Sequence, residues 1–416
     1  MSRERDPDFE LWVAEARAGS FALAMQLCGF SARKGSDKGN DIAGPCPACG
    51  GRDRFAVHLV KRKFNCRHCE AKGGDALALA LVGEHVAFVD ACEKLSGRER
   101  PQRVAAETPE ERAQRQARRE ALDQRIAEDQ AEREREQERY REREREACRR
   151  IWSMGRPAYH GERLGRYWAG RGLLPFTTAL IREADDIAFF HGDVIDEAGR
   201  RQPRVVYRGP AQLAAMLDNA GAMVGLHITH LRPDWSGKAE IVDPETGESL
   251  NPKKMRGSKK GSHIVLRQPA PEILAAARRD GLPVRLFMGE GIETAGQVGT
   301  SLKHARRLLP SDIFWASGDL GNLGGDAVGT IAHPTLKTPK GRPQRLPSAE
   351  PDLDAPAILI PAEVTQLCLL GDGDSEPFLT RTTLERARAR YARPGLEIAI
   401  AMAPEGEDFN SLARAE

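Results

Sequence analysis

The stretch Cys46-Pro-Ala-Cys49, followed after sixteen residues by Cys66-Arg-His-Cys69, decides how the first part of the chain folds. Each CxxC pair places two thiolates on one tight turn, and two such turns can close a tetrahedral shell of four sulfurs around Zn²⁺. A redox-active pair is the alternative, but a second pair at this spacing favours the metal. We therefore predict a zinc ribbon in which Cys46, Cys49, Cys66 and Cys69 bind a structural zinc, because four thiolates leave no open position for chemistry.

Length and composition describe a polar protein with room for several domains. The chain has 416 residues, 40% of them hydrophobic, and a net charge of +2; its mean hydropathy is −0.51. No apolar run approaches the ~20 residues that span a bilayer, and the start Met1-Ser-Arg-Glu-Arg-Asp has no apolar signal-peptide core. The other cysteines have no pairing spacing. We expect reduced thiols, a cytoplasmic location and no membrane association.

The first 150 residues divide into two parts. In residues 1–100, two helical stretches, Phe9–Cys28 and Asp75–Leu95, flank the zinc ribbon. Residues 101–150 are mostly Glu, Arg, Gln and Ala, and Thr108-Pro-Glu-Glu is typical of a helix start. Apolar a and d positions are missing, which disfavours a coiled coil. We predict a long, solvated helical linker; a basic nucleic-acid-binding helix is the weaker alternative, because Glu neutralises Arg throughout.

The remainder of the chain changes pattern once more. Residues 151–266 contain short alternating runs, which predict an antiparallel sheet. In residues 267–416, apolar strands alternate with helices, which predicts a parallel sheet. Gly318–Ala355 is rich in Gly and Pro and reads as an insertion. Within it, Gly318–Gly325 lacks the spacing of a dinucleotide fingerprint and is expected to be a flexible loop. The predicted fold class is multi-domain, α+β and α/β.

Acidic residues follow three predicted strands of the last domain. Glu290 follows one strand, Asp372 and Asp374 follow the next, and Pro404–Asp408 follows the last. The carboxyl ends of parallel strands meet at one edge of a sheet, where clustered carboxylates repel one another unless a cation neutralises them. Oxygen ligands favour Mg²⁺ or Mn²⁺, which act mainly in phosphoryl chemistry. The alternative is that these acidic turns only cap strands and helices.

This ordered set of carboxylates resembles the pattern of the Toprim domain, a Rossmann-like parallel-sheet domain shared by DnaG-type primases, topoisomerases and some nucleases. Together with the ribbon pattern Pro-Cys-Pro-x-Cys-Gly-Gly-x-Asp-Arg-Phe at 45–55, it makes the chain similar to phage and plasmid DNA primases. The resemblance covers nearly everything except the charged linker. It implies that Glu290, Asp372 and Asp374 are catalytic and bind magnesium, with Asp408 as a further ligand.

The chain also departs from this family at several positions. Cys49 stands where cellular primases have histidine, although the phage relatives use cysteine. Glu293 and Thr294 replace the usual aspartate after Glu-Gly, which leaves the role of Glu293 open. No P-loop is present, so helicase activity would require a separate replicative helicase.

Basic residues mark the expected nucleic-acid and nucleotide contacts. A Gly/Ser-rich segment ahead of the last domain is expected to be a loop that cradles phosphates, with an ordinary solvated loop as the alternative. His227 and Arg232, at a strand end, form a second candidate. On the ribbon, cations interleaved with aromatics, represented by Arg54 and Phe64, suit single-stranded DNA. The cations of the expected loop are Lys253, Lys254, Arg256, Lys259 and Lys260.

The resemblance implies a DNA primase, a nucleotidyltransferase of the DNA-directed RNA polymerase type. It would extend a primer from NTPs on a single-stranded DNA template by attack of a 3′-hydroxyl on an α-phosphate. Two alternatives stay open. The first is a Toprim nuclease that uses the same carboxylates, and the second is a non-catalytic zinc-ribbon protein that binds DNA as a replication accessory.

Overall fold

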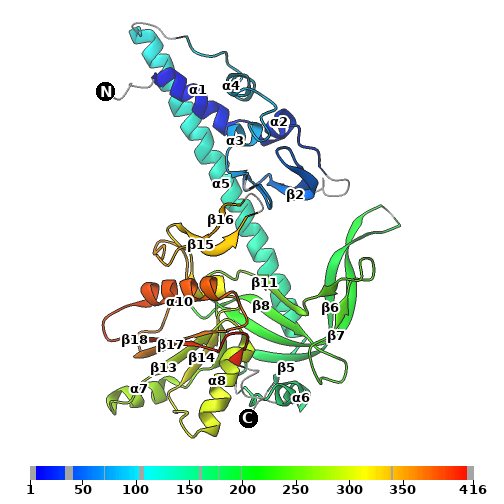
Figure 1. Cartoon of the computed structure of the whole chain (residues 1–416), viewed down its shortest axis with the longest axis vertical. Coiled ribbons are helices and arrows are strands. Elements are labelled where there is room, and N and C mark those ends of the chain that lie inside the picture. Colours follow the sequence, from blue (N-terminus) through cyan, green and yellow to red (C-terminus); the bar gives the residue numbers. More distant parts are fainter. Residues whose placement is uncertain are drawn as a thin grey trace. The chain divides into compact units, whose positions relative to one another are not determined.

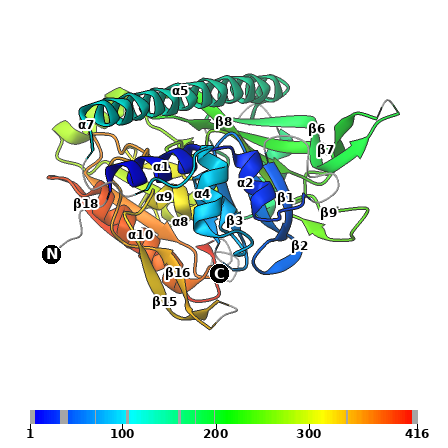
Figure 2. The ribbon, with the colours of Figure 1, turned by 90° about the horizontal axis from the view of Figure 1, so that it is seen from above.

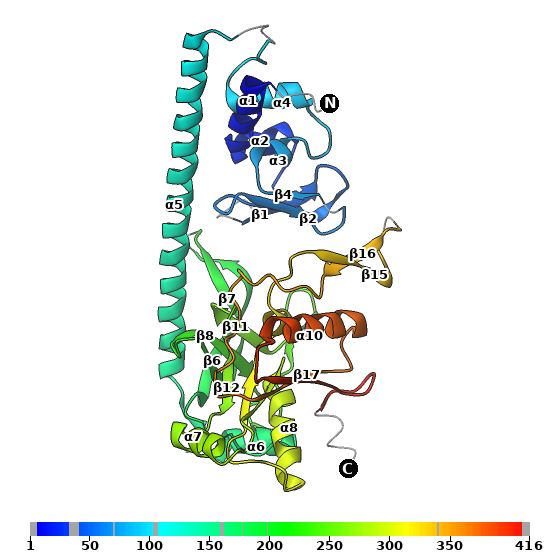
Figure 3. The same cartoon turned by 90° about the vertical axis from the view of Figure 1, so that its left-hand side faces the viewer.

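The computed structural model describes residues 6–32, 41–69, 71–102, 107–158, 162–176, 178–197, 199–338 and 341–409. The chain divides into two compact units, Met1–Arg139 and Tyr140–Glu416 (Figure 1). One helix, α5 (Pro109–Ser153), belongs to both units and is continuous over its whole length (Figures 2 and 3). Each unit is described by itself below.

The first unit combines short helices with a small antiparallel sheet of order β1-β2-β3-β4. β2 and β3 form a hairpin between the two cysteine pairs: Phe55 of β2 pairs with Cys66 of β3, and Val57 pairs with Phe64. The elements are α1 (Pro7–Ala18), α2 (Phe21–Leu27), β1 (Asp41–Cys46), β2 (Gly50–His58), β3 (Lys63–Cys66), β4 (Lys72–Gly73), α3 (Ala76–Ala80) and α4 (Phe88–Ser96).

Both helical stretches that flank the small sheet are broken, where the sequence predicted continuous helices. α1 ends before Gly19, and Ser20 starts α2 by accepting a hydrogen bond from the backbone N–H of Leu23 at 3.3 Å. Asp75 caps α3, accepting from the backbone N–H of Ala78 at 2.8 Å. The break between α3 and α4 lies at residues 81–87. The breaks let short helices turn back onto one apolar core.

The predicted helix of the charged segment is confirmed as α5. Its start is a capping box: the Thr108 hydroxyl accepts from the backbone N–H of Glu111 at 3.2 Å, and the Glu111 carboxylate accepts from the backbone N–H of Thr108 at 2.8 Å. Along the helix, opposite charges pair one turn apart, as Arg135 does with Glu132 at 2.7 Å. Exposed pairs of this kind each stabilise a helix by only about 0.2–0.5 kcal/mol.

The second unit contains two five-stranded sheets. The first sheet is antiparallel throughout, in the order β11-β8-β7-β6-β5, as the alternating runs predicted. β6 and β7 extend beyond it as a long two-stranded ribbon (Figure 2). Its elements, with two short outlying strands, are β5 (Arg156–Pro157), α6 (Glu162–Gly170), β6 (Ile181–Ile195), β7 (Arg201–Leu217), β8 (Met223–His230), β9 (Ile241–Val242), β10 (Ser249–Leu250) and β11 (Lys253–Gly257).

The other sheet has the order β12-β14-β13-β17-β18. β14, β13, β17 and β18 run parallel, as predicted, and β12 is an antiparallel edge strand. An inserted hairpin, β15–β16, precedes β17. The elements are β12 (Ile264–Arg267), α7 (Pro271–Arg279), β13 (Arg285–Gly289), α8 (Ile292–His304), β14 (Ile313–Ala316), α9 (Leu320–Gly324), β15 (Thr330–Lys337), β16 (Pro343–Pro347), β17 (Gln366–Gly371), α10 (Pro377–Tyr391) and β18 (Glu397–Met402).

Helices cover both faces of this parallel sheet, with α8 and α10 on opposite sides (Figures 1 and 3). Phe287 of β13 packs in the cluster that contains Ile292 of α8. Its neighbours Leu286 and Met288 belong to the cluster that contains Leu384 of α10. This alternation leaves the edge where the parallel strands end as the place for polar side chains.

Candidate functional site

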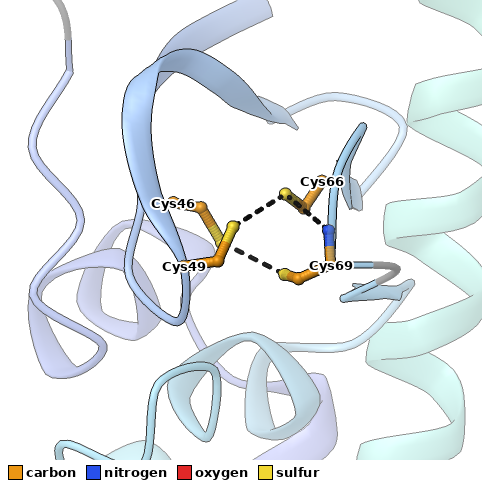
Figure 4. Close-up of side chains that lie close together, drawn as sticks. All are labelled: Cys46, Cys49, Cys66 and Cys69. Carbon is orange, nitrogen blue, oxygen red and sulfur yellow. Dashed lines mark hydrogen bonds between the residues drawn. The ribbon is translucent and has the colours of Figure 1, made fainter. Parts of the chain in front are cut away.

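The four predicted cysteines come together in the first unit (Figure 4). The Sγ atoms of Cys46 and Cys69 are 3.6 Å apart, as are those of Cys49 and Cys66. All four ligand atoms lie within 4.8 Å of one another. A tetrahedral Zn²⁺ with Zn–S bonds of about 2.3 Å needs sulfurs about 3.8 Å apart. The donor set and its spacing are therefore compatible with structural zinc.

The backbone already favours a thiolate at one of these cysteines. Burial raises the pKa of Cys66. Hydrogen bonds from the backbone N–H groups of Cys69 and His68, each 3.4 Å from its Sγ, and with the Cys69 and Cys49 side chains together lower the pKa to about 7. At Cys46, burial is the dominant cause and raises the pKa to about 12. Cysteine binds metal as the thiolate, so a bound cation would supply the charge that keeps all four sulfurs deprotonated.

The predicted acidic residues lie where the parallel strands end. Glu290 follows β13 directly, Asp372 follows β17 directly, and Asp408 follows β18 by a short turn. Backbone hydrogen bonds join these strand ends: the N–H of Gly373 donates to Glu407 O at 2.8 Å. A Cβ at Gly373 would sit 2.0 Å from Pro404 O, so only glycine allows this approach.

The carboxyl groups at this edge disturb one another's ionisation. Burial raises the pKa of Glu290, and the charges of Asp372, Asp319 and Asp374 raise it further. Burial also raises the pKa of Asp372, and the charges of Asp374 and Asp408 raise it further. A hydrogen bond from the Thr294 hydroxyl at 3.0 Å opposes this shift. Such a cluster is stabilised by a cation, and its oxygen donors suit Mg²⁺ or Mn²⁺.

The acidic edge is more open than the cysteine cluster. In the described ranges, only the four cysteines bring three or more potential ligand atoms within 4.8 Å of one another. Asp374 is exposed, whereas Glu290, Asp372 and Asp408 are partly buried. The structure thus places the predicted carboxylates at one edge of the sheet, but without three of their oxygens within 4.8 Å of one another.

Asp319 also belongs to this edge and was missed in the sequence. It follows β14, so the signal used for the other acids, a carboxylate after an apolar strand, would have found it. The sequence instead favoured a flexible loop at Gly318–Gly325, and that expectation is wrong. Asp319 accepts from the backbone N–H of Asn322 at 2.7 Å and starts the short helix α9.

The prediction of a basic loop is wrong for Lys253–Gly257, because these residues form strand β11 and pair with β8. Its cations also have partners. Lys253 pairs with Glu293 at 3.5 Å and Arg256 with Glu144 at 3.0 Å, and Lys254 lies 4.5 Å from the centre of the Phe189 ring. Lys259 and Lys260 lie in the loop that follows, and they pair with Asp319 and Asp326.

The second basic candidate separates into a buried and an exposed part. His227 is 7% exposed, and burial followed by the charge of Lys253 lowers its pKa to about 4, so the ring is neutral. Its Nδ1 has no hydrogen-bond partner among the described residues. Arg232 is on the surface and pairs with Glu240.

On the small sheet of the first unit, the expected stacking of bases on Phe64 is not supported. Phe64 is only 4% exposed and packs against Phe55 with ring centres 5.8 Å apart. Strand β3 alternates exposed and buried residues, which turns Phe64 inward. Arg54 is half-buried and folds over Gly51, near Cys49.

A cavity of about 300 Å³ in the second unit is lined by residues of both sheets. Residues of the antiparallel sheet, among them His227 and Lys253, face residues of the acidic edge, among them Glu290 and Asp319. Aromatic side chains of α6, Tyr167 and Trp168, complete the wall. The cavity thus combines carboxylates that can hold a cation with ammonium groups that can meet an anion.

Comparisons with known proteins agree with this description only coarsely. A family model described as a domain of unknown function (DUF7146) matches residues 142–266, the part that holds the antiparallel sheet. No curated protein matches the chain. In the part of the chain that the structure describes, no helix is both long and apolar enough to cross a membrane.

Several solved structures of primases are similar to the chain at low identity. The DnaG catalytic core matches with 14% identity, 61% of this chain and 69% of that chain covered, and a TM-score of 0.31. A DNA primase domain from Pseudomonas aeruginosa matches with 14% identity and a TM-score of 0.28, and the match covers 60% of this chain and 66% of that chain. A DnaG primase catalytic domain bound to single-stranded DNA matches with 16% identity and a TM-score of 0.26, and the match covers 54% of each chain. The chain spans between half and about two thirds of these solved chains, and its function has to be argued from its own residues.

Proposed function

We propose that the chain is a DNA primase that synthesises short primers on single-stranded DNA by metal-dependent nucleotidyl transfer, encoded by a phage, a plasmid or an integrated mobile element. The observation that carries this proposal is the acidic edge of the parallel sheet. Glu290 and Asp372 are partly buried, and burial together with neighbouring carboxylates raises the pKa of each, which is costly unless a cation is bound. Glu290 also lines the cavity of the second unit, and a carboxylate with a perturbed pKa in a cavity is typical of a functional site.

Residues 267–416 would form the Toprim domain, with Glu290, Asp372, Asp374 and Asp408 as ligands of Mg²⁺ or Mn²⁺. A divalent cation held by these residues would activate the attacking hydroxyl and stabilise the charge on the leaving pyrophosphate. The protein contributes the geometry. Thr294 holds the carboxylate of Asp372 by its hydrogen bond, and the pairing of β13 with β17 places Glu290 and Asp372 directly after neighbouring strands.

Residues 151–266 would bind nucleotide and template through their cations. The ion pairs of Lys259 and Lys260 lie at the surface, with lysine side chains 43% and 51% exposed. Exposed pairs contribute only about 0–1 kcal/mol, so phosphates can replace their partners. Lys254, Arg256, His227 and Arg232 complete the proposed nucleotide and template contacts. Both NTPs and single-stranded DNA would be ligands of this part.

Residues 1–100 would form the zinc ribbon and bind the template, and residues 101–150 the helical linker. A depression of about 520 Å³ on the small sheet has Lys61, Lys63 and Lys72 around the inward-facing Phe64. Cations around an apolar floor suit single-stranded DNA, and Arg54 lies on the same strand as two of the lining residues. The proposal also includes a cytoplasmic location and a separate replicative helicase as partner.

The experiment that tests this function incubates the full chain with a single-stranded template, labelled NTPs and Mg²⁺, and analyses the products on a denaturing gel. Short labelled products that require both template and metal support the primase. Cleaved template without new product would identify the Toprim nuclease. DNA binding with neither product would identify the accessory protein and contradict the enzyme.

A further inference from the structure

Glu293 is a buried carboxylate surrounded by cations. Its side chain is 13% exposed, and its Oε2 lies 2.7 Å from Nζ of Lys238, 3.4 Å from a guanidinium nitrogen of Arg171 and 3.5 Å from Nζ of Lys253. The Tyr167 hydroxyl donates a hydrogen bond to its other oxygen. Although burial raises the pKa of Glu293, the three cations lower it to about 2, so the carboxylate is ionised at every physiological pH.

The partners of Glu293 come from separate segments of the second unit. Tyr167 is on α6 and Arg171 follows that helix, Lys238 lies between β8 and β9, and Lys253 begins β11. Glu293 itself is in the first turn of α8, where the helix dipole favours a negative charge. One carboxylate therefore ties the antiparallel sheet to α8, the helix that starts two residues after Glu290.

Of the three cations around Glu293, Lys253 is the one that also lines the cavity. Lys253, Glu293 and Glu290 all line it, and the charge of Lys253 lowers the pKa of Glu290 while the neighbouring carboxylates raise it. A lysine side chain is long and flexible, so an ammonium group that must meet a phosphate beside Glu290 gains from a fixed anchor. Lys238 and Arg171 hold that anchor in place.

We propose that Glu293 is a positioning residue, which fixes the ammonium group of Lys253 in the cavity wall so that it meets the phosphates of a nucleoside triphosphate beside Glu290. The inference rests on the proposed function for the identity of the ligand. It gives a role to a residue that stands where the resembled family has a different pattern.

An effect of net charge alone and a positioning role predict opposite changes in ATP affinity for Glu293→Gln. If only net charge mattered, removal of an anion beside the cavity would tighten the binding of a triphosphate. If Glu293 positions Lys253, the variant binds ATP more weakly, because the ammonium group is no longer fixed and three neighbouring cations repel one another. We expect about a tenfold increase in the ATP dissociation constant at neutral pH, and an increase in KM larger than the decrease in kcat.

The pH dependence provides a second signature. Burial lowers the pKa of Lys238, and Glu293 opposes that shift. Without Glu293 the pKa of Lys238 falls further, so its charge is lost at a lower pH as the pH rises. Of the other groups that face Lys238, Arg171 and Lys253 are cations, His227 is already neutral, and burial raises the pKa of Tyr167 so that it stays protonated.

The test measures ATP binding to the full-length protein from about pH 7 to about pH 10, the range below the ordinary lysine pKa. Glu293→Gln should lose affinity at a lower pH than the wild type, and Glu293→Asp, which keeps the charge, should recover much of the wild-type profile. The control is Asp312→Asn. Asp312 is a buried carboxylate paired with Arg285 at 2.7 Å, but it precedes β14 and lies at the opposite edge of the sheet.

Three outcomes decide the inference. Weaker ATP binding with an earlier alkaline loss in Glu293→Gln, and not in Asp312→Asn, supports it. Equal or tighter binding, or a loss shared by both variants in proportion to their melting temperatures, overturns it while the proposed function stands. If the wild type binds no ATP, the proposed function fails instead. If Glu293→Gln does not fold, Lys238→Met replaces it in the test. Because this variant lacks the group that loses its charge, its ATP binding should fall less at alkaline pH than that of the wild type. An unchanged alkaline loss overturns the inference.

Discussion

At the scale of single residues, two adjacent residues of α8 interact with groups of opposite charge: Thr294 with an anion and Glu293 with cations. The hydroxyl of Thr294 donates to Asp372, whose pKa is raised by burial and by nearby carboxylates. The carboxylate of Glu293 is surrounded by cations that lower its pKa to about 2. A single helix turn thus stabilises one anion at the acidic edge and anchors the cations that face it. The site therefore combines a region that needs a cation with one that can accept an anion.

The first prediction concerns stability without metal. Because the pKa of Glu290 is raised in the folded protein, the folded state holds this proton more tightly than the unfolded chain does. Its contribution to stability is present below the ordinary pKa of about 4.3 and is lost as the pH rises through the raised value. Glu290→Gln removes this loss. Its melting temperature at neutral pH, without metal, should equal or exceed that of the wild type by up to a few degrees.

Thermal melts at about pH 4 and pH 7, with and without Mg²⁺, measure this effect. The advantage of Glu290→Gln should vanish at the lower pH, and Mg²⁺ should stabilise the wild type more than the variant, because a ligand stabilises the state that binds it. A variant that melts well below the wild type at neutral pH without metal would show that Glu290 is a structural anchor instead.

At the scale of elements, β11 shows what composition alone cannot decide. Gly and Ser around Lys253–Lys260 favoured a loop, but Lys253–Gly257 forms a strand because β8 offers a partner edge, with Lys253 opposite Thr229. That partner is distant in sequence, so local propensity could not show it. The strand fixes where Lys253 and Arg256 point, and it leaves Lys259 and Lys260 in the loop that follows.

The second prediction concerns those two lysines. Replacing Lys259 and Lys260 by Ala should weaken the binding of single-stranded DNA and reduce the slope of log K against log salt by about 0.7 for each lost phosphate contact. The control replaces Arg278 and Arg279, two exposed cations in the last turn of α7, before the start of β13. A salt titration with an equal slope in both double variants would show that the lysines do not touch the DNA.

At the scale of the whole molecule, the features read correctly from the sequence are those fixed by local spacing. The CxxC pairs, the helix start at Thr108 and the alternation of strands and helices depend on nearby residues. The partners of Glu293 and the burial of Phe64 depend on packing across the fold. For Phe64 a local signal existed, since the alternation along β3 places it on the face of the buried Cys66. For Glu293 no such signal existed.

The third prediction treats the two units as separate bodies. The full chain should bind one Zn²⁺, because four thiolates lie within 4.8 Å of one another. Cys66→Ser should lose that zinc and the melting transition of the first unit, since the metal supplies much of the folding energy of such a site. The second unit should keep its response to Mg²⁺. Elemental analysis and calorimetry check both points, with Cys368→Ser as the control; a wild type without zinc contradicts the assignment.

The central claim is that carboxylates at one edge of the parallel sheet support primer synthesis. The most direct measurement is primer synthesis on single-stranded DNA by the wild type, Glu290→Gln, Asp372→Asn and the control Glu397→Gln, which alters a carboxylate at the start of β18, at the opposite edge. The account predicts synthesis by the wild type and by Glu397→Gln, and a loss of at least about a hundredfold in the other two. Primer synthesis retained in Glu290→Gln or Asp372→Asn would contradict it.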